Sequence, residues 1–525
     1  MPDPSPDPHP QESGTSILLI TADQFRFDAI AAHGNPHIDT PNLDRLVASG
    51  MTFQRGYTES PVCVPARAGL LTGRRPHRSG VFDNSTPLEE GTPTITRELA
   101  DAGLHTQAIG KMHFRTRETT HGFEDLALSE EVPHDTTTDA FLKHLHDAGV
   151  THVAEPHGVR HELYYSPQPS QLPVELHTTT WTGERTAAYL EERAADGRQF
   201  FCWTSFIKPH PPFDPPYPYY LKYDPLTMPD PVRSESERER LGYHGRHQHR
   251  VKWTSPDLGL DTIRTIRAYY YALVSHVDAE IGRILDTLEE TGLRERTLVV
   301  FTADHGEYLG DHWCYGKRGF HDSAARIPFV LSQPGTIPEG GRSDALVGLI
   351  DLAPTFLAAT GTAATTLDPD GASVLPVATG AQDAIRDTWF GQYHHGPEGL
   401  YCAMNSRYKY IYSAADGREA LLQVGSDETV DLLSPDHAAD LAGVDVRLEA
   451  DLLRKAIMEQ FRADSYTEPL TTDGGWRVHP PMSMPALPGN GDRDPTGRGR
   501  QYPHWLGHVP HPRTATGGSD VEPLF

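Results

Sequence analysis

Short apolar runs alternate with amphipathic segments along most of the chain. Four runs rich in β-branched and aromatic residues are predicted to be buried strands: 16–22, 105–110, 200–206 and 297–303. Three segments have helical spacing or helix boundary residues: 40–50, 92–103 and 263–291. Strands that alternate with helices favour an α/β fold, in which helices cover both faces of a large, mostly parallel sheet.

The hydrophobic pattern changes near residue 387. Short strand-like pieces separated by turn residues precede a helical segment at 446–461, which predicts an antiparallel sheet packed on a helix, a smaller C-terminal α+β subdomain. The expected organisation is a disordered leader at 1–15, a main α/β domain at 16–386 with a long loop insertion at 211–259, a subdomain at 387–466, and a tail at 467–525. The Pro-, Gly- and His-rich tail is either disordered or an arm that lies on another surface.

The charge balance excludes two classes of partner. The chain carries 46 Lys and Arg residues against 72 Asp and Glu residues, a formal net charge of −26. Nucleic acids and anionic membranes repel such a surface, so neither is expected as a partner. An anionic substrate would have to be held by a local cluster of cationic side chains.

The N-terminal residues lack the basic and apolar regions of a secretory signal. No apolar run reaches the roughly 18 residues that a transmembrane helix needs. A cytoplasmic protein is therefore expected. The four cysteines lack the spacing of a zinc knuckle or of a disulfide framework, and Cys202, Cys314 and Cys402 are expected to be packing residues.

Polar side chains follow the four predicted strands. They are Asp23 and Gln24, Lys111 and His113, Lys208 and His210, and Asp304 and His305. Because ligands of open α/β sheets bind outside the carboxyl ends of the strands, these side chains are candidates for one site. Among them, Asp23, Gln24, Asp304 and His305 offer the oxygen ligands that suit Ca²⁺ or Mg²⁺ and an imidazole that favours Mn²⁺. A single Asp at a strand end more often caps a turn.

A short helix is predicted to begin after Cys63, with Pro65 in its first turn and Gly73 at its end. Backbone N–H groups at a helix N-terminus favour an anion. Cys63 is therefore an activated thiolate or a buried structural cysteine.

The stretch Cys63-Val-Pro65-Ala-Arg67, followed by Leu71-Thr-Gly73-Arg, resembles the C-x-P-x-R signature of type I sulfatases, members of the alkaline phosphatase superfamily. Further blocks resemble the family in the same order: 40–46, 110–113, 208–210, 302–307, 316–318 and 429–436. The resemblance implies an alkaline-phosphatase-like fold and hydrolysis of a sulfate monoester to an alcohol and inorganic sulfate. It also implies one divalent metal, with Ca²⁺ expected and Mn²⁺ or Mg²⁺ as alternatives. The nucleophile would be formylglycine, made from the cysteine by a formylglycine-generating enzyme.

Carried over by position, the resemblance assigns the site residues. The metal ligands would be Asp23, Gln24, Asp304 and His305, of which Gln24 and His305 depart from the Asp and Asn of many relatives. Cys63 would be the formylglycine precursor, and Arg67 would orient it. Lys111, His113, His210 and Lys317 would bind the sulfate, and Asn84 would contact the substrate. His210 or Lys317 would protonate the leaving alcohol, and His113 would accept the proton that releases sulfate.

Other functions remain open at this stage. The first is a phosphonate monoester or phosphodiester hydrolase on the same scaffold. A two-zinc phosphatase, a metal-free cysteine hydrolase and a non-catalytic sulfate-ester binding protein are further alternatives. The alcohol part of the substrate is also open among choline, aryl and sugar sulfates. The tail makes a homodimer or homotetramer an open expectation.

Overall fold

The computed structural model describes residues 14–114, 119–133, 135–160, 164–250, 258–435 and 445–483. Most of the expected leader at 1–15, and the expected tail beyond residue 483, lie outside the described residues. Among the helices that are described, none is long and apolar enough to cross a membrane.

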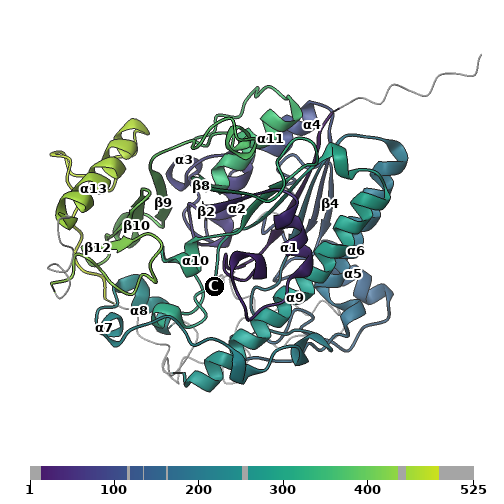
Figure 1. The fold of residues 1–525 in the computed structure, drawn as a ribbon, viewed down its shortest axis with the longest axis horizontal. Coiled ribbons are helices and arrows are strands. Elements are labelled where there is room, and N and C mark those ends of the chain that lie inside the picture. Colours follow the sequence, from purple (N-terminus) through teal and green to yellow (C-terminus); the bar gives the residue numbers. More distant parts are fainter. Residues whose placement is uncertain are drawn as a thin grey trace, which may run out of the picture.

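A mostly parallel sheet forms the centre of the described chain (Figure 1). Its strands, in spatial order, are β4 (Asp125–Leu128), β3 (His105–Gly110), β5 (Phe200–Phe206), β1 (Ser16–Ala22), β6 (Thr297–Ala303), β7 (Phe329–Ser332), β2 (Met51–Tyr57) and β8 (Gly341–Gly348). β7 runs antiparallel to β6 and β2, and the other pairs are parallel. The α/β fold class is thus confirmed, and the four predicted strands are β1, β3, β5 and β6.

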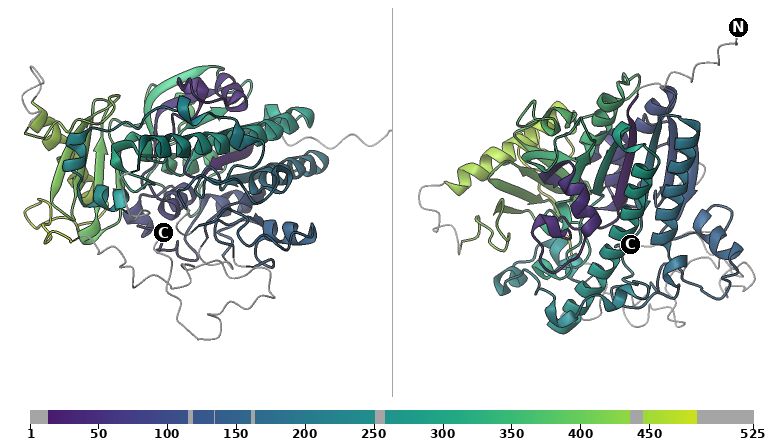
Figure 2. Two further views of the ribbon diagram at one scale, coloured as in Figure 1. Left: turned by 90° about the horizontal axis from the view of Figure 1, so that it is seen from below. Right: turned by 45° about the vertical axis from the view of Figure 1, so that its right-hand side comes forward.

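Helices cover both faces of the sheet (Figures 1 and 2). The larger ones are α1 (Pro41–Ala48), α2 (Cys63–Thr72), α4 (Ile95–Asp101), α5 (Ala140–Asp147), α6 (Thr178–Asp196), α9 (Leu260–Glu290) and α11 (Leu352–Thr360). Side chains of β5 point alternately to the two layers, because successive strand residues face opposite sides. Phe201 contacts Phe356 of α11, with ring centroids 5.6 Å apart, whereas Thr204 lies 2.9 Å from Thr186 of α6. Both faces of this strand are therefore buried.

The region predicted as a loop insertion contains short helices. Within its described part, α7 (Glu235–Glu239) and α8 (Tyr243–Arg250) precede α9. α7 begins with a capping box, in which Ser234 and Glu237 bond each other's backbone N–H groups. The sequence contains this capping pattern, but the surrounding segment is rich in Pro, Tyr and charged residues and was therefore predicted as a loop.

A second, smaller sheet follows, as predicted. It is antiparallel, in the order β12 (Arg418–Gln423), β11 (Tyr408–Ser413), β10 (Leu400–Met404) and β9 (Trp389–Tyr393). Helix α13 (Val446–Ala463) packs on one face, where Phe461 lies edge-on to Tyr401. Trp476, in the described part of the predicted tail, stacks on Tyr412 with a centroid distance of 4.2 Å. The boundaries 386/387 and 466/467 stay predictions.

Candidate active site

The predicted site residues gather at the carboxyl ends of four neighbouring strands. β1 and β6 pair in parallel up to Ala22 and Ala303, so Asp23 and Asp304 leave the sheet side by side. Both carboxylates are buried. Lys111 follows β3 and is fully buried, and His210 comes four residues after β5 and is also buried. The sheet topology thus places these side chains at one edge.

Helix α2 presents its N-terminus to this edge. Cys63 is its first residue, and the preceding Val62 provides no side-chain cap. Every residue of the helix is buried, so the N–H groups of its first turn are shielded from solvent. Asn84 Oδ1 accepts one of them, the Val64 N–H, at 3.1 Å. Gly73 ends the helix in the left-handed conformation, as the sequence predicted.

Cationic groups and possible metal ligands surround the sulfur atom of Cys63. Lys317 Nζ lies 2.9 Å from it, His305 Nε2 3.3 Å and Asp23 Oδ1 3.9 Å. Burial alone would raise the pKa of the Cys63 thiol, but Lys111, Lys317 and His305, with a hydrogen bond from His113, hold it well below its usual value. Of the two characters predicted for Cys63, this environment favours the thiolate.

Arg67 joins the two carboxylates that flank the cysteine. Its Nη2 lies 3.1 Å from both Asp23 Oδ2 and Asp304 Oδ2, and its Nη1 donates to Ser205 Oγ at 3.0 Å. Lys111 Nζ adds a further contact to Asp23 Oδ2 at 2.6 Å. Although burial opposes the charged form, the two aspartates keep the pKa of Arg67 above its ordinary value. Two buried cations thus balance the two carboxylates.

His210 is positioned by two further contacts. Its Nδ1 lies 2.6 Å from the Pro211 carbonyl oxygen, which is an acceptor, so Nδ1 carries the proton. Its Nε2 faces Glu131 at 3.4 Å and Tyr164 at 3.4 Å. Burial lowers the pKa of His210 to about 4, although Glu131 opposes this shift. At neutral pH His210 is therefore mostly uncharged, with Nε2 unprotonated.

Two buried carboxylates of the site had no assigned role at the sequence level. Glu131 contacts Lys111, Arg160 and His210, and Glu307 contacts Gln24. Burial raises the pKa of Glu307, while backbone N–H groups and Gln24 oppose that shift. Glu307 ended a motif block that the sequence did single out. Glu131 lies in the polar run 129–131, which resembles a solvated turn and gave no signal.

One cationic residue beside these strands does not join the site. Lys208 is fully buried and pairs with Asp214, and its Nζ also donates to the carbonyl oxygens of Pro212 at 2.8 Å and of His157 at 3.1 Å. Its role in the described structure is to hold the segment after β5. The strand-end pattern by itself did not separate Lys208 from Lys111.

The donor set fits one divalent cation. Asp23, Cys63, Asp304 and His305 each offer a ligand atom, and these atoms lie within 4.8 Å of one another. Gln24 Oε1 lies beside these four ligand atoms. It accepts a hydrogen bond from Lys317 Nζ, and the same Nζ contacts Cys63. Hard oxygen donors with one imidazole suit Ca²⁺, Mg²⁺ or Mn²⁺.

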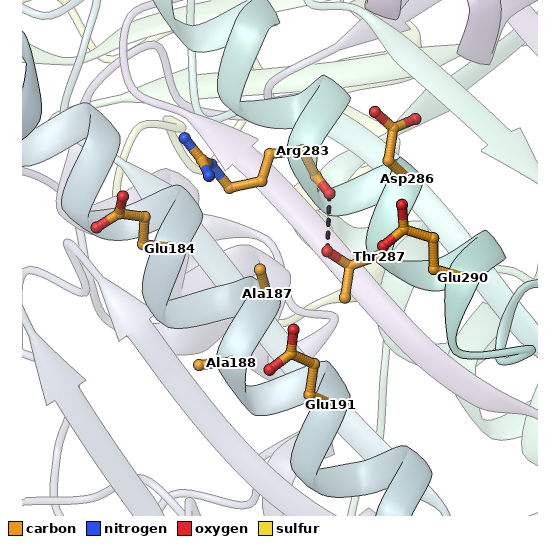
Figure 3. Close-up of a pocket in the computed structure, with 8 residues that line it drawn as sticks. All are labelled: Glu184, Ala187, Ala188, Glu191, Arg283, Asp286, Thr287 and Glu290. Carbon is orange, nitrogen blue, oxygen red and sulfur yellow. Dashed lines mark hydrogen bonds between the residues drawn. The ribbon is translucent and has the colours of Figure 1, made fainter.

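A surface hollow elsewhere in the structure does not suit an anionic ligand. It lies between α6 and α9 (Figure 3). Its lining residues are Glu184, Ala187, Ala188, Glu191, Arg283, Asp286, Thr287 and Glu290. With four carboxylates and one guanidinium, it would repel an anion, and it contains none of the predicted site residues.

The fold and the site together define an ester hydrolase of the alkaline phosphatase superfamily. The family described as "Sulfatase" matches residues 15–362, and "N-sulphoglucosamine sulphohydrolase, C-terminal" matches residues 310–427. The chain therefore belongs to the sulfatase family, as its motifs predicted, and is a sulfuric ester hydrolase by that membership.

Known relatives agree with this membership. The chain is 28% identical to an arylsulfatase from Clostridium perfringens, over 86% of this chain and 96% of the relative. It is 26% identical to a choline-sulfatase from Rhizobium meliloti, over 76% of this chain and 78% of the relative. Among solved structures, a phosphonate monoester hydrolase from Silicibacter pomeroyi is similar, with 26% identity, a TM-score of 0.71, and coverage of 89% of this chain and 99% of that one.

Proposed function

We propose that this protein hydrolyses a sulfate monoester to an alcohol and inorganic sulfate, with Cys63 as the precursor of its nucleophile. One observation carries the proposal. The sulfur of Cys63 lies at the N-terminus of a buried helix, 2.9 Å from Lys317 and 3.3 Å from His305. A sulfate group placed there would meet fixed positive charge that is shielded from water. This local cationic cluster would allow an anionic substrate to bind despite the overall charge of −26.

Two groups would complete the chemistry. Oxidation of Cys63 would give the aldehyde of formylglycine, and addition of water to it would supply a diol with a hydroxyl nucleophile. A divalent cation held by Asp23, Gln24, Asp304 and His305 would polarise the sulfate oxygens. A formylglycine-generating enzyme would be the partner in maturation. Ca²⁺ is the proposed ion, with Mn²⁺ and Mg²⁺ as alternatives.

The residues of the chain itself would neutralise charge and move protons. Arg67 and Lys111 keep the flanking carboxylates in place, and Lys317, which is only partly buried, would bind the sulfate oxygens. Lys317 would also be the first candidate to protonate the departing alcohol oxygen. His210 is the second candidate for this protonation, although its low pKa means that it would first have to take up a proton at Nε2. His113, which helps to lower the pKa of the Cys63 thiol, would accept the proton whose loss releases sulfate.

The second candidate function is hydrolysis of a phosphonate monoester or a phosphodiester. The similarity to the phosphonate monoester hydrolase from Silicibacter pomeroyi supports it. Both substrate classes are monoanions, so the overall charge of the site does not separate them. The sulfate ester comes first because the matching family and the arylsulfatase and choline-sulfatase relatives are named for it.

A direct comparison of substrates tests the proposal. We expect the protein to hydrolyse 4-nitrophenyl sulfate with a higher kcat/KM than 4-nitrophenyl phenylphosphonate, when both are assayed with the same preparation. Competition by choline sulfate and by sugar sulfates would then identify the alcohol part of the substrate. A higher kcat/KM for the phosphonate would replace the first proposal by the second.

A further inference from the structure

Glu307 is a buried carboxylate whose two oxygens are both occupied. Oε1 accepts the Leu309 N–H at 3.0 Å and the Gly316 N–H at 2.6 Å. Oε2 accepts the Tyr165 hydroxyl at 3.3 Å and the Gln24 side-chain amide. Because four donors converge on it, Glu307 has a fixed orientation and presents an acceptor to Gln24.

The backbone of Gln24 is fixed as well. Its φ of 64° lies in the left-handed region, which is strained for a residue with a side chain. Its N–H donates to Asp304 Oδ1 at 3.0 Å, and its carbonyl oxygen accepts the Tyr270 hydroxyl at 2.8 Å. The remaining freedom is the rotation of the carboxamide, which decides whether oxygen or nitrogen faces the cation site.

Two contacts select the same orientation of this carboxamide. The Gln24 Nε2 group donates to Glu307, and Gln24 Oε1 accepts from Lys317 Nζ at 2.9 Å. A rotated amide would direct Nε2 at the Lys317 ammonium and Oε1 at the Glu307 carboxylate, and both bonds would be lost. A divalent cation that took Gln24 Oε1 would repel Lys317 from that oxygen, which leaves Glu307 as the contact that holds the amide.

We propose that Glu307 is a positioning residue that directs the Gln24 oxygen, rather than its nitrogen, into the cation site. The inference rests on the proposed function in one respect, the binding of a divalent cation at Asp23, Gln24, Asp304 and His305. It also accounts for a neutral residue at position 24, since a carboxylate there would face the carboxylate of Glu307.

A double-mutant cycle on cation binding tests this inference. The four proteins are the wild type, Glu307→Gln, Gln24→Glu and the double variant, each freed of metal and titrated with CaCl₂, and in parallel with MnCl₂, by calorimetry. In Glu307→Gln, the new amide keeps its oxygen on the N–H groups of Leu309 and Gly316, so its nitrogen turns Gln24 the wrong way. We expect this variant to bind the cation at least tenfold more weakly.

The double variant restores the pair in reverse. The amide at position 307 then donates to the carboxylate at position 24, whose other oxygen faces the cation. If the two substitutions acted independently, their fold-changes in cation affinity would multiply. We expect the double variant to bind the cation at least tenfold more tightly than that product predicts. The inference would be overturned if the affinity of the double variant lay within about threefold of the product of the two single fold-changes. It would also be overturned if the wild type bound neither Ca²⁺ nor Mn²⁺.

Glu98→Gln is the matched control for loss of stability. Glu98 is also a buried carboxylate that accepts several N–H and O–H bonds, from Thr365, Thr366 and Leu367, but it lies away from the cation site. We expect it to lower the Tm while it leaves cation affinity unchanged. The cycle measures cation binding, not turnover. If positions 24 and 307 were coupled in a protein without sulfatase activity, only the proposed function would be contradicted. An additive cycle in an active enzyme would contradict only the role of Glu307.

Discussion

Lys317 Nζ lies 2.9 Å from Cys63 Sγ, although 254 positions separate the two residues in the chain. In the proposed reaction this lysine protonates the leaving oxygen. Lys317→Met should therefore lower kcat about 10²- to 10⁴-fold for an alkyl sulfate, whose alkoxide needs a proton. The loss should be smaller for 4-nitrophenyl sulfate, because 4-nitrophenolate leaves without one. Equal losses for the two esters would show that Lys317 binds the sulfate but does not donate the proton.

Cys63→Ala should abolish turnover and leave the fold intact. Alanine is compatible with the first turn of a helix, so the fold should be kept. Its methyl group cannot be converted into a nucleophile, so turnover should be lost. Cys202→Ala is the matched control, since Cys202 is also a buried free thiol but lies within β5. We expect the control to keep its kcat with a modest loss of Tm. Appreciable turnover of a sulfate ester by Cys63→Ala would contradict the mechanism.

A buried carboxylate outside the site should make stability fall as the pH rises. Burial, with Asp351 nearby, raises the pKa of Glu59 from 4.5 to about 7. The folded state therefore holds this proton more tightly than the unfolded state does, and stability falls between about pH 4.5 and pH 7. The full effect is about 3 kcal/mol. Urea unfolding of wild type and Glu59→Gln at pH 5 and pH 8 should show the larger decrease in the wild type. Equal decreases would remove Glu59 as the cause.

A buried lysine ties the smaller sheet to the segment that contains the short helix α10 (Asp322–Ala325). Lys409 of β11 donates to the Phe320 carbonyl oxygen at 2.8 Å, and its Nζ lies 2.6 Å from carboxylate oxygens of Asp322 and Glu428. Lys409→Met removes the buried ammonium that these two carboxylates share, which should cost about 3–5 kcal/mol of unfolding free energy. Lys143→Met, which removes an exposed pair with Asp147, should change it by less than about 1 kcal/mol. Similar losses for both variants would be evidence against this role of Lys409.

Parts of the structure followed from local patterns in the sequence. Asp23 and Asp304 could be paired in advance because both follow apolar runs, and parallel strands bring their carboxyl ends to one edge. The helix that begins at Cys63 could be predicted from Pro65 in its first turn and Gly73 at its end. These signals depend on residues close together in the chain.

Other parts depend on contacts between distant segments and gave no local signal. The antiparallel placement of β7 between β6 and β2 is fixed by its neighbours, not by its own residues. Glu131 lies in a polar stretch and Lys208 follows a buried strand, yet Glu131 faces Lys111 in the site, and Lys208 is buried against Asp214. Only the folded chain distinguishes a carboxylate of the site from one in a solvated turn.

The central claim is that Cys63 is converted into the nucleophile of a sulfate ester hydrolase. The most direct measurement is the mass of the tryptic peptide 56–67, from protein made in its native host. The account predicts an aldehyde at position 63, with turnover of sulfate esters that increases with the fraction of modified peptide. An intact thiol in a preparation that hydrolyses sulfate esters at full rate would contradict it.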